Sequence, residues 1–296
     1  VDVAADSTLV VSDTGNNRIQ LLAPDGTPIR SWPVDSPQGL EIVGDWIYVV
    51  SAGDDALLAF DLDGTPQRTT GLAPLCQVPE ALAYIGDLSA GTEHPLARFL
   101  VTDVASHQVF EVQEGGAGAT GRFDLDGVRA VAYWDSTVVA GADALGVALV
   151  DDDGNVAGHL PFARVNDIEV ASDGSDGLLA AVGRDGAIVI PEPFLITLGS
   201  PLGQLVQPRL IGVADDALGV LIADSVPRLH VWSRQGQPLR EIGTGSTSVS
   251  DVAGAGAYAY ALVRNAGVSR VEQAGFSNDE YRFSKRDGQW PLALDS

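Results

Sequence analysis

A pattern that returns about every 42 residues constrains this sequence more than any other feature. In each copy, a short apolar strand, a polar turn and a second apolar strand follow one another, as in residues 39–50 and 81–101. The apolar residue that begins each copy gives the alignment Val3, Leu40, Leu82, Val131, Ile168, Ile211 and Val252, with successive spacings of 37, 42, 49, 37, 43 and 41 residues. A period of this length is typical of one propeller blade of four strands. The longest spacing indicates an insertion at residues 87–98.

Each copy continues with a third strand, a tight turn and a more polar fourth strand. Six of the seven units close this turn with Gly, as at Gly26, Gly64 and Gly154, and the unit around residues 191–193 lacks it. The fold class predicted is all-β: a seven-bladed β-propeller of four-stranded antiparallel blades, formed by residues 1–296 as a single domain. Six blades remain the alternative if one unit is degenerate. A pair of β-sandwiches would not require a constant period.

One segment carries a family resemblance. Val11-Ser12-Asp13-Thr14-Gly15-Asn16-Asn17-Arg18-Ile19-Gln20 resembles the signature of the NHL repeat, in which an apolar strand ends in Asp and a Thr-Gly-Asn-His-Arg sequence follows. Residues 101–109 and 222–229 are similar more loosely and keep Asp103 and Asp224, whereas Ser51 and Ala140 replace the Asp elsewhere. The resemblance implies a propeller that binds proteins, RNA or glycans, or in a minority of cases acts as a lyase or hydrolase. It does not by itself define an activity.

The charge balance excludes some partners. Forty acidic residues against seventeen basic ones give a net charge of -23, which repels phosphate backbones and anionic lipids. We therefore expect no nucleic-acid partner and, because no apolar run is long enough for a span, no membrane insertion. The start at Val1, the absence of Met, the acidity and the repeat class favour a trimmed, periplasmic or secreted protein.

The strongest candidate site is a polar ring at the mouth of the central channel. The residue two positions before each aligned apolar residue should face this mouth, where convergent polar groups can hold a ligand. These residues are Val1, Gln38, Glu80, Arg129, Asn166, Arg209 and Ser250, and the next position adds Asp2, Asp167 and Asp251. The alternative interpretation is that Glu80 only pairs with Arg129 or Arg209 in a wet channel.

A metal site is a second alternative at the same place. Glu80, Asn166 and Asp251 offer the oxygen ligands that Ca²⁺ prefers, in a pattern that resembles gluconolactonase-type propellers. Two arginines in the same ring argue against it, so no cofactor is predicted. The sequence Asp151-Asp152-Asp153-Gly154-Asn155 begins like a calcium loop but is better explained as an Asp-Gly turn.

The loops that follow the second strands should form an upper rim that contacts a partner. The candidate rim residues are Asn16, Asn17, Arg18, His107 and Arg228. Asp13, Asp103 and Asp224 share one position in these loops, which indicates backbone capping. His107 is expected to make a structural hydrogen bond, and Cys76, the only cysteine, to be a packed thiol.

Two functions follow from these residues. The first is a non-enzymatic binding or scaffold propeller that recognises a protein, a peptide or a glycan on its upper face, because no catalytic constellation is evident. The second is a lactonase- or lyase-type enzyme with a divalent cation at the channel.

Overall fold

The computed structural model of the chain contains β-strands and one short 3-10 helix in the residues that it describes. These are residues 1–74, 76–87, 96–116, 119–134, 137–151, 153–160, 164–172, 177–183, 186–191, 196–198, 205, 210–213, 219–223, 228–233, 238–243, 249–255, 258–263 and 267–272. Within them, no helix is long and apolar enough to cross a membrane.

The strands follow one another in groups that match the repeat. The first two groups are β1 (Asp2–Val3), β2 (Leu9–Asp13), β3 (Arg18–Leu22) and β4 (Pro28–Pro33), then β5 (Pro37–Val43), β6 (Trp46–Ser51), β7 (Ala56–Asp61) and β8 (Pro66–Gly71). The next two are β9 (Pro79–Asp87), β10 (Ala97–Asp103), β11 (Gln108–Gln113) and β12 (Ala119–Asp124), then β13 (Ala130–Trp134), β14 (Thr137–Ala142), β15 (Gly146–Val150) and β16 (Val156–Leu160). The 3-10 helix spans Thr14–Asn16, between β2 and β3.

The second half of the chain repeats the arrangement. Its strands are β17 (Val165–Ser172), β18 (Gly177–Gly183), β19 (Gly186–Pro191) and β20 (Ile196–Leu198), then β21 (Leu210–Val213), β22 (Gly219–Ala223), β23 (Arg228–Ser233) and β24 (Pro238–Gly243), and finally β25 (Val249–Ala255), β26 (Tyr258–Val263) and β27 (Gly267–Glu272).

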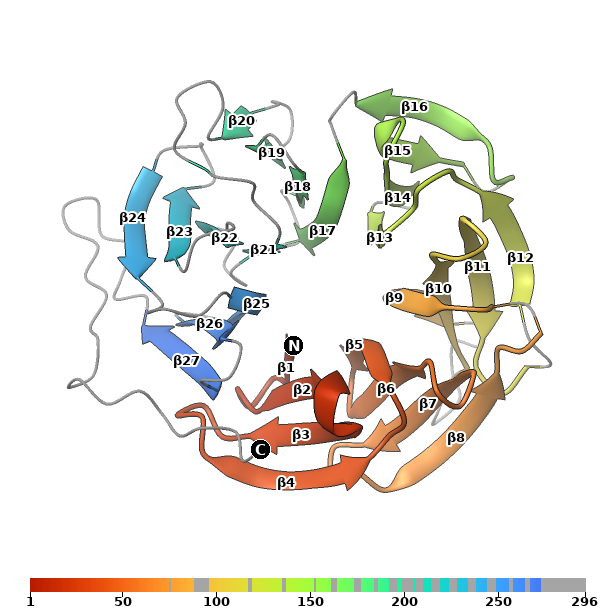
Figure 1. Cartoon of the computed structure of the whole chain (residues 1–296), viewed down its shortest axis with the longest axis horizontal. Helices are drawn as coiled ribbons and strands as arrows, with labels where there is room; N and C mark the ends of the chain where they lie inside the picture. Colours follow the sequence, from red (N-terminus) through yellow and green to blue (C-terminus); the bar gives the residue numbers. More distant parts are fainter. Residues whose placement is uncertain are drawn as a thin grey trace.

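Each group of strands forms its own antiparallel sheet, with the strands in chain order. In the described residues, six sheets have four strands and the sheet β25–β27 has three. Figure 1 shows the sheets arranged around a central opening, with the first strand of each sheet nearest to it. The prediction of an all-β propeller with four-stranded antiparallel blades is confirmed.

The burial of a strand depends on its place in the blade. The middle strand β6 is almost entirely buried because both of its faces pack against neighbouring blades, and it consists of Trp46, Ile47, Tyr48, Val49, Val50 and Ser51. The outer strand β4 is exposed along most of its length. Its first residue, Pro28, suits a strand with one open edge, because proline offers no N–H to a further strand.

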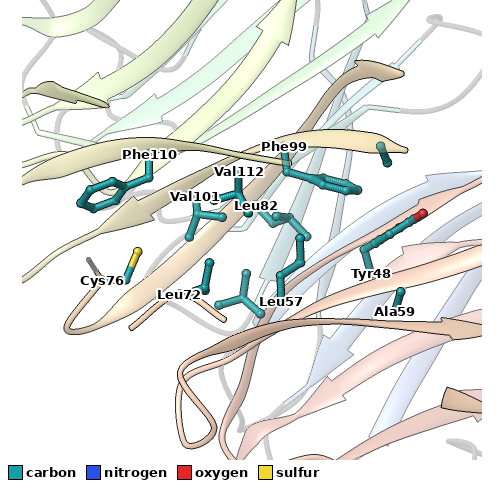
Figure 2. Packing of buried hydrophobic residues seen from close by; sticks show 12 residues of the cluster. Tyr48, Leu57, Ala59, Leu72, Cys76, Leu82, Phe99, Val101, Phe110 and Val112 are labelled. Atoms are coloured by element: carbon teal, nitrogen blue, oxygen red, sulfur yellow. The ribbon is translucent and has the colours of Figure 1, made fainter. Parts of the chain in front are cut away.

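The hydrophobic cores lie between blades rather than within them. Figure 2 shows one such core, in which Tyr48 and Leu57 of one sheet meet Leu82, Phe99 and other residues of the next. The rings of Tyr48 and Phe99 have centroids 4.5 Å apart. Cys76 is 4% exposed in the same core, where burial raises the pKa of its thiol to about 12. Cys76 is therefore a packed thiol.

The last and first sheets also share a core. Tyr260 of β26 packs with Leu9, Val11 and Leu22 of the first sheet, and β1 contacts β25 as well as β5. The chain thus returns to its starting point, and the two ends of the repeat pack against each other.

Asp103 caps backbone N–H groups, as expected. Asp103 is fully buried and accepts hydrogen bonds from the N–H groups of Gln77 (2.7 Å), Val78 (3.0 Å) and Ala105 (3.0 Å). Burial acts to raise the pKa of Asp103, but these hydrogen bonds outweigh it and the pKa lies below its ordinary value. The carboxylate therefore ties the loop before β9 to the loop after β10.

The Asp103→Ala variant should lose about 2 to 3 kcal/mol of unfolding free energy, because a hydrogen bond to a charged acceptor contributes about 1.5 to 3 kcal/mol. Because folding lowers the pKa, the stabilisation by Asp103 is present above about pH 4 and is lost as the pH falls. Urea unfolding at pH 7 and pH 3.5 measures both effects. The exposed Asp45 provides the control: Asp45→Ala should change stability by less than about 0.5 kcal/mol. Equal losses in the two variants would contradict the capping role.

Gly39 allows two inner strands to approach closely. A Cβ atom at this position would lie 2.7 Å from the Glu80 carbonyl oxygen and 2.8 Å from the Leu82 nitrogen, both of which are backbone atoms of β9. Any side chain at position 39 therefore pushes β5 and β9 apart.

The Gly39→Ala variant should be destabilised by about 1 to 3 kcal/mol, the usual cost of overpacking. Gly71, where a Cβ atom would meet nothing within 4 Å, supplies the matched Gly71→Ala control. Differential scanning calorimetry should show a clear drop in Tm for the first variant only. A Tm of Gly39→Ala equal to that of the control would show that the strands can separate without cost.

Candidate functional site

The inner strands enclose a cavity at the centre of the ring. Its volume is about 1640 Å³, and its lining includes residues of β1, β5, β9, β13, β17, β21 and β25. Residues 12–16, at the end of β2 and in the loop that follows, border the same cavity. This border defines the upper mouth, where the inner strands begin.

Five of the seven predicted mouth residues line this cavity. They are Val1 directly before β1, Gln38 on β5, Glu80 on β9, Arg129 directly before β13 and Asn166 on β17. Glu80, Arg129 and Asn166 are exposed and Gln38 is half-buried. Arg209 lies outside the described residues, and for Ser250 only the backbone, in β25, is described.

Glu80 and Arg129 influence each other, and Arg129 also lies close to Asp143. Burial raises the pKa of Glu80, and the positive charge of Arg129 only partly offsets this. The Arg129 guanidinium Nε lies 3.8 Å from Asp143 Oδ1, which is also 3.7 Å from Arg164 Nε. The mouth therefore presents a negatively charged residue on β9 and a positively charged residue directly before the neighbouring strand β13.

The predicted rim residues hold the loops in shape. Asp13 accepts hydrogen bonds from two side chains, the Asn16 amide (3.0 Å) and Arg18 Nε (2.7 Å), rather than from backbone N–H groups as predicted. Asn17 accepts one from the Ser36 N–H (3.0 Å). His107 Nδ1 accepts a hydrogen bond from the Gly127 N–H at 3.1 Å, the structural role expected for it.

Two of these residues share a backbone conformation. Asn17 and His107 end their loops with positive φ, at 50° and 58°. Arg228, the fifth candidate, begins β23 and is half-buried, whereas Asp224 lies outside the described residues.

Carboxyl groups inside the channel connect neighbouring blades. Asp2 accepts a hydrogen bond from the Ile42 N–H of the next inner strand at 2.8 Å, and Asp167 accepts one from the Ile211 N–H at 3.0 Å. Asp251 accepts hydrogen bonds from the N–H of Val252 and from the Val1 nitrogen. An inner strand is the open edge of its sheet, so these carboxyl groups satisfy N–H groups that no strand pairs.

Two glutamates of the channel were not among the sequence candidates. Glu41 of β5 and Glu169 of β17 line the cavity, and Glu41 Oε1 accepts a hydrogen bond from the Tyr84 N–H at 3.4 Å. Both follow the aligned apolar residue directly, at Leu40-Glu41 and Ile168-Glu169. A charged residue within an apolar inner strand was the signal that could have identified them.

The channel environment raises the pKa of several carboxyl groups. Burial, reinforced by the charge of Asp2, raises the pKa of Glu41 to about 8. Burial and the nearby Asp251 raise the pKa of Asp167 to about 7, against the effect of its hydrogen bonds. Glu169 is exposed to the cavity but enclosed by the blades around it, and this burial, with the charges of Asp167 and Glu41, raises its pKa well above the ordinary value.

The metal alternative has little support from the described residues. Among them, no group of three or more His, Cys, Asp or Glu side chains is placed to hold a metal ion. Asp251, the carboxylate that would join Glu80 and Asn166, is engaged with backbone nitrogens. The calcium-like segment is a turn, in which Asp151 accepts hydrogen bonds from the N–H groups of Asp153 (3.1 Å) and Asn155 (2.8 Å).

Comparison with known proteins defines the class through the fold. No protein-family model matches the chain, and no curated protein matches it by sequence. Among solved structures, hydrazine synthase of Kuenenia stuttgartiensis superposes with a TM-score of 0.72 at 13% identity, covering 92% of this chain and 94% of that one. The Myceliophteria thermophila Cps50 (Swd1) β-propeller domain gives 0.66 at 12% identity, covering 90% and 97%. The chain is thus a β-propeller, and at these identities the likeness concerns the fold alone.

The raised pKa values predict a stability that decreases toward alkaline pH. Glu41 and Asp167 hold their protons more tightly when folded than in the unfolded chain, where their pKa values are about 4. Their contribution is therefore fully present below pH 4 and is lost as the pH rises through about 7 to 8. The unfolding free energy should fall by more than about 1 kcal/mol between pH 6 and pH 9, since one pKa unit corresponds to about 1.4 kcal/mol.

Urea titrations at pH 6, 7.5 and 9 measure this loss. The Glu41→Gln variant should lose less stability over the same interval, because its amide does not ionise. Glu111, which pairs with Arg98 at 3.3 Å away from the channel, supplies the control: Glu111→Gln should keep the pH dependence of the parent protein. A flat profile in the parent would contradict the assignment.

Proposed function

We propose that this chain is a non-enzymatic binding propeller that recognises a protein, a peptide or a glycan at the upper mouth of its channel. The observation that carries the proposal is the presence of opposite charges side by side at an open cavity. Glu80 on β9 and Arg129 directly before the neighbouring strand β13 are both exposed, and both line the cavity. Rigid strands that present a few polar groups around a concavity are typical of binding sites.

A peptide is the ligand that fits this mouth best. A peptide backbone offers both donors and acceptors, and Gln38 and Asn166 provide amide groups on the two sides of the charged residues. The described part of the cavity lining contains no His or Cys, which removes the usual nucleophile and base pairs from these residues. The net charge of -23 makes nucleic acid an unfavourable partner.

We also propose the number of blades, the type of repeat and the location of the protein. Seven sheets in the described residues, and contacts that lead from β1 through each inner strand to β25 and back to β1, support seven blades in one closed domain of residues 1–296. The capping of backbone N–H groups by Asp103 supports the NHL-type repeat. A periplasmic or secreted location rests on the acidity and the repeat class.

The enzymatic alternative has one observation in its favour. Glu41 and Asp167 have pKa values near neutrality, as general acids and bases need. A lactonase- or lyase-type reaction with a divalent cation would require that EDTA lowers the Tm and that elemental analysis finds the metal. A metal-free protein with an unchanged Tm would exclude that reaction.

Selection of a random peptide library on the immobilised full chain tests the proposal. Peptides enriched on the parent protein should bind Arg129→Glu at least about tenfold more weakly, because the substitution places a second carboxylate beside Glu80. Arg30→Glu, a charge reversal on the outer strand β4, should bind within about twofold of the parent. A glycan array treated in the same way covers the other ligand class.

Thermal melting of each variant separates a lost contact from a lost fold. Equal binding by Arg129→Glu and the parent would move the binding site away from the mouth. If neither library yields a ligand above the level of the empty support, the binding function itself is contradicted.

A further inference from the structure

Two tyrosines lie deeper in the channel, beyond the mouth. Tyr84 of β9 and Tyr133 of β13 each follow the aligned apolar residue of their strand by two positions. Both line the cavity and both keep part of their surface exposed. Because β9 and β13 are in contact, the two aromatic residues occupy equivalent positions on adjacent strands.

The ring of Tyr84 is fixed in place. Its centroid lies 5.7 Å from that of Phe99, with the planes tilted by 58°. Burial and a hydrogen bond with the Asp87 carboxylate raise the pKa of the Tyr84 hydroxyl to about 12, so the phenol is neutral at physiological pH. A ring held by packing on one side and by a hydrogen bond at its tip is a rigid platform.

Hydrogen-bonding groups stand beside this platform. The Glu41 carboxyl lies 3.4 Å from the Tyr84 nitrogen, and Glu169 lines the cavity on β17. Since the pKa of Glu41 is about 8, its carboxyl group is mostly protonated at pH 7 and can both donate and accept. Val43 and Val170 complete this part of the lining with apolar surface.

We propose that this deeper part of the channel binds a neutral sugar unit, stacked on Tyr84 and Tyr133 and hydrogen-bonded by Glu41 and Glu169. A pyranose ring has an apolar face of C–H groups and an edge of hydroxyl groups, each of which donates and accepts. Aromatic rings with a few placed polar groups are complementary to such a molecule. An anionic sugar is disfavoured, because the channel also holds Asp2, Asp167 and Asp251.

This site is separate from the ligand proposed for the mouth. Tyr84 lies four residues after Glu80 on β9, and Tyr133 lies four residues after Arg129. At the rise of about 3.3 Å per residue of a strand, the two levels are about 13 Å apart. The proposed sugar site is therefore independent of the proposed peptide site and can be tested separately.

Saturation-transfer NMR on the full chain tests the proposal with neutral probes, namely the methyl β-glycosides of glucose, galactose and N-acetylglucosamine. At least one of them should receive saturation through its ring protons. Tyr133→Ala should weaken its binding about tenfold, because a stacked aromatic contact contributes about one factor of ten. Tyr133→Phe keeps the ring and should bind within about threefold of the parent.

Two further samples make the outcomes distinct. Arg129→Glu should leave the sugar signal unchanged even where it removes binding at the mouth, so failure of one site is not mistaken for failure of the other. Tetramethylammonium serves as a cationic probe of the same aromatic rings. The proposal is overturned if none of the three sugars binds, if Tyr133→Ala binds as well as Tyr133→Phe does, or if only tetramethylammonium binds.

Discussion

The open edge of each innermost strand is the constraint on which this structure depends. An inner strand pairs with one neighbour in its own sheet, and its other edge faces the channel or the next blade. The N–H groups on that edge need acceptors that the sheet does not supply. Asp2 and Asp167 provide them from the preceding blade, at 2.8 Å to the Ile42 nitrogen and 3.0 Å to the Ile211 nitrogen. Side-chain carboxyl groups thus accept hydrogen bonds from backbone N–H groups between blades, as carbonyl groups of the paired strand do within a blade.

The use of carboxyl groups as acceptors concentrates negative charge in the channel, where burial disfavours charged groups. Asp2, Asp167 and Asp251 share the channel with Glu41 and Glu169, and burial together with the neighbouring charges raises the pKa of Glu41, Asp167 and Glu169. Protonation relieves the repulsion while keeping a hydrogen-bonding group in place. The ring is therefore closed most firmly when some of these carboxyl groups carry a proton, and the same groups give the channel its chemical character.

The sequence was sufficient for the part of the structure that repeats. A period near 42 residues and turns such as Pro24-Asp25-Gly26 identified an all-β propeller, and counting back two positions from the aligned apolar residues found five residues that line the cavity. Glu41 was missed although its charge within an apolar inner strand could have identified it. Tyr84 was missed because an apolar strand does not indicate which of its side chains meet the channel and which meet a neighbouring blade. Their roles depend on residues outside their own strand: Tyr84 packs against Phe99 on the adjacent strand β10, and its N–H donates to a glutamate of the preceding blade, 43 residues earlier. Spacing within one repeat does not contain that information.

The middle and inner strands of a blade have different roles, and this difference explains how such a channel can come to bind a ligand. The middle strands carry the inter-blade cores, as Val49 and Phe99 do, and substitutions there would open cavities. The inner strands carry less of this packing, so their channel-facing positions can change with little effect on the fold. At the position directly after the aligned apolar residue, the chain has Glu41 on β5, Ala83 on β9, Ala132 on β13 and Glu169 on β17. This variation breaks the symmetry of the repeat along the channel wall, and an asymmetric wall is what allows a ring of similar blades to hold one ligand in one orientation.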